Sequence, residues 1–74
     1  MESQIIYAFE SAQVANRFIN TLKNWPKAEV NARLYRGSMK VLVSYSYDDK
    51  GFDSTAADLD DLAAQYDGTE VPLR

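Results

Sequence analysis

The chain has 74 residues, a net charge of −3, 46% hydrophobic residues, and neither cysteine nor histidine. This length is that of a single domain, residues 1–74, and the hydrophobic content is too high for a disordered chain. The missing cysteines exclude disulfides and thiolate metal sites, and the missing histidines remove the usual general base near neutral pH.

The charge is unevenly distributed along the chain. Residues 1–40 have a balance of +3, whereas residues 41–74 have a balance of −6. The acidic balance opposes phosphate binding, so we expect no direct contact with nucleic acid. The start, MESQ, lacks the pattern of a secretion signal, and the longest apolar run, Ile5 to Phe9, is too short to span a bilayer. We therefore expect a cytoplasmic protein that does not bind membranes.

A strand followed by a helix is predicted at the start of the chain. Gln4–Phe9 is short and rich in β-branched and aromatic residues, which favours a strand. Ser11 is the expected helix N-cap, and Pro26 is expected to end the helix. Between them, apolar residues recur at helical spacing within an arc of about 140°. These residues are Val14, Ala15, Phe18, Ile19, Leu22 and Trp25.

The middle of the chain predicts an antiparallel hairpin. Ala28–Tyr35 and Lys40–Tyr47 both alternate apolar and polar residues, as half-buried strands do. Arg36–Ser38 between them is a short segment that contains glycine, which suits a hairpin turn.

A second helix is predicted after this hairpin. Asp53 or Ser54 is the expected N-cap, and Asp67 with Gly68 is expected to end the helix. Its apolar face consists of Ala56, Leu59, Leu62, Ala63 and Tyr66. Residues 69–74 allow one more strand, which Pro72 restricts to a sheet edge.

This order of elements, βαββα with a possible final β, predicts an α+β fold. The economical packing is a two-layer sandwich in which two helices cover one face of an antiparallel sheet. With the final strand, the order is that of a ferredoxin-like split βαβ arrangement.

All seven aspartates lie in residues 47–68, which raises the question of a metal loop. An EF-hand pattern centred on Gly51 fails, because Lys50 and Ala57 fall at ligand positions. A weaker calcium site would use Asp48, Asp49 and Asp53. We expect no metal site and no cofactor, because the aspartates also suit turns and a helix start.

The aspartates of the second helix allow a further interpretation. Asp58, Asp60 and Asp61 spread over its solvent side, where carboxylates can simply be solvated. Alternatively, the same carboxylates can dock on a basic partner or imitate a phosphate backbone.

Catalysis is not expected from these residue types. The usual general base and the strongest nucleophile are absent, and the three glycines lie at turns and not in a phosphate loop. The aspartates lie where nothing buries them to raise a pKa.

The sheet face opposite the helices is the second candidate surface. Strand alternation places on it Ile6, Ala8, Arg33, Tyr35, Lys40 and Leu42. An apolar centre flanked by cations and tyrosine is typical of interface cores. Alternatively, this face is only the wet side that every two-layer domain has.

The sequence therefore predicts a non-catalytic domain that binds a protein partner or a second copy of itself. The candidate residues are Ile6, Arg33, Tyr35, Lys40, Leu42, Asp58, Asp60 and Asp61. Stacked apolar sheet faces would resist salt, whereas contact between the basic half and the acidic helix would weaken in salt. The alternatives are an acidic decoy for a nucleic-acid-binding protein and a regulatory domain for a small ligand.

Overall fold

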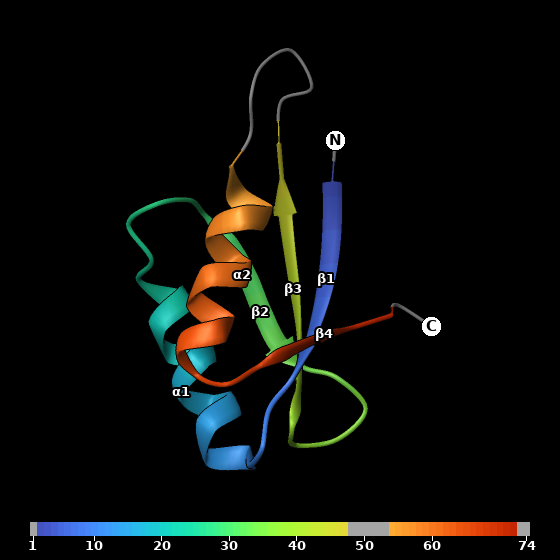
Figure 1. The fold of residues 1–74 in the computed structure, drawn as a ribbon. Helices are drawn as coiled ribbons and strands as arrows, with labels where there is room; N and C mark the ends of the chain where they lie inside the picture. Colours follow the sequence, from blue (N-terminus) through green and yellow to red (C-terminus); the bar gives the residue numbers. More distant parts are fainter. Residues whose placement is uncertain (1, 48–53, 73–74) are drawn as a thin grey trace.

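The computed structural model describes residues 2–47 and 54–72 and contains six elements (Figure 1). They are β1 (Glu2–Ala8), α1 (Ala12–Lys23), β2 (Val30–Leu34), β3 (Lys40–Ser46), α2 (Thr55–Gln65) and β4 (Thr69–Val71). The predicted order of elements is confirmed. The possible last strand is present, but only as a short element that ends before Pro72.

The strands form one antiparallel sheet in the order β2-β3-β1-β4. The predicted hairpin of β2 and β3 is confirmed, with Ala32 opposite Val43. β1 lies between β3 and β4, with Ile6 opposite Leu42 on one side and Val71 on the other. β2 and β4 are therefore the edge strands, and Pro72 lies just beyond the end of β4.

Both helices lie on the same side of the sheet (Figure 1). One core cluster joins side chains of both helices to alternate residues of β1 and β3. Its buried members are Ile5, Tyr7, Phe9, Ala15, Phe18, Ile19, Leu22, Val41, Val43, Tyr45, Leu59 and Ala63. The predicted apolar faces of the strands and helices therefore meet each other, which makes the fold an α+β arrangement of one sheet and one helical layer.

Phe18 of α1 is the centre of an aromatic cluster in this core. Its ring lies 5.6 Å from that of Tyr7, 4.8 Å from that of Phe9 and 6.0 Å from that of Tyr66. Since Tyr66 follows α2, one side chain connects the sheet and both helices. Edge-to-face and tilted contacts of this kind stabilise a core beyond the area that they bury.

Hydrogen bonds close the helix ends. Val14 donates its backbone N–H to Ser11 Oγ at 3.2 Å, which confirms the predicted N-cap of α1. At the end of α2, Asp67 adopts a left-handed conformation (φ 58°), and Gly68 N–H reaches the Ala63 carbonyl at 2.8 Å. This is a Schellman arrangement in which Asp67 takes the position usually held by glycine. Gly68 is needed for another reason, because a Cβ there would lie 2.5 Å from the ring of Phe9.

The start of α2 differs from the expected cap. Ser54 precedes the helix, but its side chain makes no capping hydrogen bond and instead donates to the Asp58 carboxylate at 3.1 Å. Asp53, the alternative cap, and the calcium alternative at Asp48, Asp49 and Asp53 lie outside the described residues.

Candidate interaction surface

The side of the sheet away from the helices, which we call the outer face, is built by strand alternation. Because Tyr7 and Val43 point to the helices, their neighbours in β1 and β3 point the other way. The strand register arranges these neighbours in rows across the sheet. From β2 to β4 the rows are Asn31, Ser44 and Gln4, then Arg33, Leu42, Ile6 and Val71, and finally Lys40, Ala8 and Thr69.

Ile6 and Leu42 lie on the outer face as predicted, but they are not available on its surface. Ile6 is only 1% exposed and Leu42 only 3%. Both lie on central strands, with Arg33 next to Leu42 in β2 and Val71 next to Ile6 in β4. The register therefore gives these central positions same-face neighbours on adjacent strands. The expected exposed apolar centre is therefore absent, and this part of the predicted surface is corrected.

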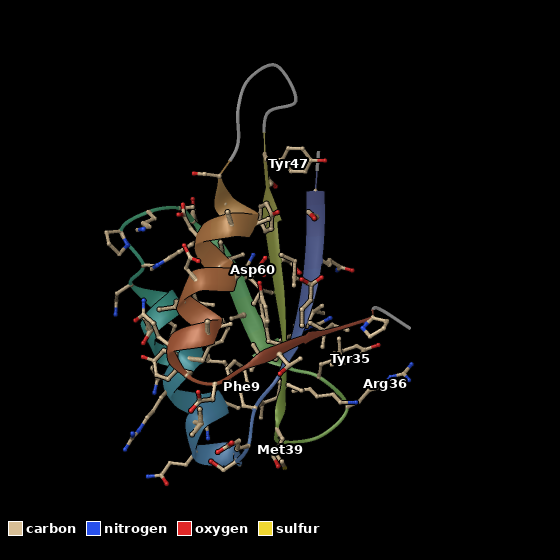
Figure 2. All side chains as sticks on the ribbon, in the orientation of Figure 1. Phe9, Tyr35, Arg36, Met39, Tyr47 and Asp60 are labelled. Atoms are coloured by element: carbon tan, nitrogen blue, oxygen red, sulfur yellow. The ribbon has the colours of Figure 1, made fainter. Side chains whose placement is uncertain are left out.

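The exposed part of the predicted surface is basic. Arg33 and Lys40 are exposed, and Tyr35 is half-buried beside Lys40, whose carbonyl accepts the Tyr35 N–H at 2.9 Å. Arg36 lies over the Tyr35 ring at 5.3 Å, a cation–π contact. Figure 2 shows Tyr35 and Arg36 on the side of the sheet away from the helices.

A polar hollow occupies the other end of the outer face. It has a volume of about 410 Å³, and its lining includes Glu2, Glu29, Asn31, Ser44 and Ser46. Two further depressions share Ser44 with it and extend it towards Gln4 and Arg33. The hollow therefore runs along the strands from the acidic side chains towards the basic ones.

The charges of the outer face are separated by sign. Glu2 and Glu29 lie at the end where β1 begins, and Arg33 and Lys40 lie towards the opposite end. Ala8 of β1 is paired with Lys40 of β3. Glu2 and Ala8 are about 20 Å apart along β1, at about 3.3 Å per residue, so the two charged ends are separated by a similar distance. All four side chains are exposed, and no ion pair joins any of them to another described residue.

The helix α2 carries the second predicted surface, and the structure does not bring it together with the first. α2 lies on the opposite side of the sheet from the outer face (Figures 1 and 2). Asp58, which is 26% exposed, pairs with Lys27 at 3.6 Å and also accepts from Ser54. Asp61 is exposed, and no described residue bonds its side chain.

Asp60 has a structural contact that the sequence does not reveal. Its carboxylate accepts a 2.5 Å hydrogen bond from the hydroxyl of Tyr7, which is 1% exposed. Burial raises the pKa of Tyr7 well above its ordinary value of 10, and the Asp60 carboxylate raises it further. Tyr7 therefore stays protonated and donates to Asp60 over the physiological range.

Other kinds of site find no support in the part of the chain that the structure describes. Within residues 2–47 and 54–72, no three acidic side chains come together to hold a metal ion. Neither of the two helices there is long and apolar enough to cross a membrane. The chain matches no protein-family model, no curated protein and no solved structure.

The predicted candidate residues do not include Glu2 and Glu29, which also belong to the outer face. The strand was expected to begin at Gln4, but it begins at Glu2, and this extension places one more carboxylate on the face. Glu29 lies just before β2 and shares the alternation of Asn31 and Arg33. Glu29 already lay within the predicted strand Ala28–Tyr35, on the same side as Arg33, and continuing the alternation of Gln4–Phe9 by two residues would have found Glu2.

Proposed function

We propose that this chain is a cytoplasmic, non-catalytic protein-interaction domain that binds a protein partner or a second copy of itself through the outer face. One observation carries this proposal: the face that neither helix covers has exposed charges of both signs and a polar hollow. Charged groups on an open surface that are not neutralised within the chain are suited to recognise another molecule. Because the negative and positive side chains lie at different ends of the face, they also favour one orientation of the bound partner.

The Asp-rich helix supports the alternative surface less well. Asp58 and Asp60 already have partners within the chain, and Asp60 stabilises the buried hydroxyl of Tyr7. An acidic decoy needs carboxylates that are free to replace phosphates. Only Asp61 of the three meets that need among the described residues, so we place the interaction on the outer face.

The proposal of a non-catalytic role follows from the available groups. Without histidine and cysteine, the titratable side chains in the described core are Tyr45 and Tyr7, of which the more deeply buried is Tyr7. Its raised pKa makes it a poor base or nucleophile near neutral pH. Its hydroxyl is also engaged by Asp60.

We also propose that the fold is ferredoxin-like. The βαββαβ order and the sheet order β2-β3-β1-β4 support this assignment. Domains of this kind leave one sheet face open, which agrees with a binding role but does not identify a partner.

Site-specific photocrosslinking in cells tests the proposed function. Benzoylphenylalanine is placed at Asn31, an exposed residue in the lining of the hollow, and as a control at Ala64, an exposed residue of α2. We expect a protein adduct from position 31 and none from position 64. An adduct from position 64 alone, or none from either position, would contradict the proposal.

A further inference from the structure

Four of the charged residues on the outer face form a self-complementary pattern. Glu2 and Glu29 lie beside the hollow at one end, and Arg33 and Lys40 lie towards the other. Two such faces can be related by a two-fold axis that lies between them, parallel to the sheets and perpendicular to the strands. This axis reverses the strand direction of one copy relative to the other. This rotation places the acidic end of each copy over the basic end of the other, twice in the same complex.

We propose that the outer face binds a second copy of this chain, with the two sheets stacked face to face and their strands antiparallel. This inference rests on the proposed function and specifies its partner. A partner of uniform charge would be attracted by one end of the face and repelled by the other, whereas a second copy satisfies both ends. Charge complementarity therefore selects the chain itself.

The composition of the face sets the character of this dimer. Ile6 and Leu42 are already buried within one copy, so stacking adds little apolar burial. The face measures about 20 by 20 Å, or about 800 Å² for two copies, which is below the about 1,200–2,000 Å² of stable interfaces. The dimer is therefore weak, reversible and dependent on its charges.

Salt should consequently dissociate the dimer. At about 0.5 M salt the screening length falls below about 5 Å, so exposed pairs lose most of their attraction. This behaviour differs from that of an apolar sheet-to-sheet dimer, which the sequence alone suggested and which salt would leave intact. Because contact with α2 would also respond to salt, variants are needed to locate the interface.

Two charge-reversal variants test the proposal by sedimentation velocity at low salt. R33E/K40E reverses both cations of the strands and leaves Arg36 of the following turn, so the outer face becomes mainly acidic, and E2K/E29K makes it basic. We expect the wild type to dimerise as its concentration rises towards about 1 mM, and each variant alone to associate at least about tenfold more weakly. An equimolar mixture should restore association, because the acidic face of one variant now matches the basic face of the other.

Matched controls separate this effect from net charge. R17E/K23E on α1 changes the net charge as R33E/K40E does, and E10K/D61K changes it as E2K/E29K does; all four control positions are exposed. We expect both controls to dimerise like the wild type. Circular dichroism should show native secondary structure for every variant, since all the substituted side chains are exposed.

Several outcomes would overturn the proposal. A wild type that stays monomeric, a mixture that does not associate, or controls that weaken the dimer as much as the face variants would each do so. The proposed function can survive this failure. An adduct from position 31 to a protein of another mass, together with a monomeric chain, would leave the outer face as the interaction surface and remove the second copy as its partner.

Discussion

The helix-facing side and the outer face of the sheet use alternate residues of the same strands, but their side chains meet different surroundings. On the helix-facing side, Tyr7 and Val43 are covered by α1 and α2. On the outer face, Ile6 and Leu42 are just as deeply buried without any helix above them. The strand register gives both residues same-face neighbours within the sheet, and polar and charged groups are exposed around them.

This difference teaches that the face of a residue and its burial are separate properties. Strand alternation determines the face, whereas the position within the sheet and the size of the neighbours determine burial. The outer face has a buried apolar row and an exposed charged rim. The buried row contributes to the stability of the fold, whereas the charged rim is exposed to solvent.

Phe18→Ala should have the largest effect, because it removes the side chain that connects the sheet to both helices. Phe18 is fully buried and contacts Tyr7, Phe9 and Tyr66. We expect a loss of about 3–5 kcal/mol in the free energy of unfolding. Urea denaturation measures this loss. Phe18→Leu, which keeps most of the volume, should cost clearly less and serves as the control if the alanine variant does not fold.

Leu42→Ala tests whether the apolar row of the outer face is part of the folded structure. Because Leu42 is 3% exposed, we expect a loss of about 2–4 kcal/mol. Arg33→Ala in the same row should cost less than about 0.5 kcal/mol, since Arg33 is exposed. Equal small losses in urea denaturation would contradict the burial of this row. Leu42→Asp would unfold the domain and is therefore unsuitable as a test of binding.

Asp60→Ala and Asp61→Ala compare two neighbouring carboxylates of α2. The first leaves the buried Tyr7 hydroxyl without its acceptor, so we expect a loss of about 1–3 kcal/mol. The second removes an exposed carboxylate with no partner among the described residues and should stay within about 0.5 kcal/mol. Thermal unfolding at pH 7 distinguishes them, and equal values would show that the Tyr7 hydrogen bond contributes nothing.

The pH dependence of stability isolates the same hydrogen bond with a smaller expected effect. The pKa of Tyr7 is raised in the folded state, so its contribution to stability is complete below the ordinary tyrosine pKa of 10. Above that pH the unfolded chain loses the proton while the folded chain retains it, and stability falls. Tyr7→Phe should therefore reduce the decline of the melting temperature between about pH 9 and pH 11. An unchanged decline would contradict the assignment.

Much of the fold could be predicted from the sequence because its signals are local. The spacing of Val14, Phe18 and Leu22 predicts a helix, and the alternation of Val41 and Val43 predicts a strand and its buried side. The Ser11 cap depends only on a residue three positions away. These features need no knowledge of distant parts of the chain.

The candidate site was less predictable because its decisive contacts are long-range. Tyr7 and Asp60 are 53 positions apart, and Lys27 meets Asp58 only after the helices pack. Leu42 lies opposite Ile6 of β1, 36 positions earlier in the chain, as well as opposite Arg33 of β2. Alternation correctly assigned Ile6 and Leu42 to the outer face, but it contains no information on how their neighbours shield them.

A dilution series of ¹H–¹⁵N correlation spectra would test the central claim, that the outer face is the interaction surface, most directly. We predict that amide signals of Gln4, Asn31, Arg33 and Ser44 shift with protein concentration, while those of Asp61 and Ala64 on α2 stay constant. Concentration-dependent shifts confined to α2, or spread evenly over the molecule, would contradict the account.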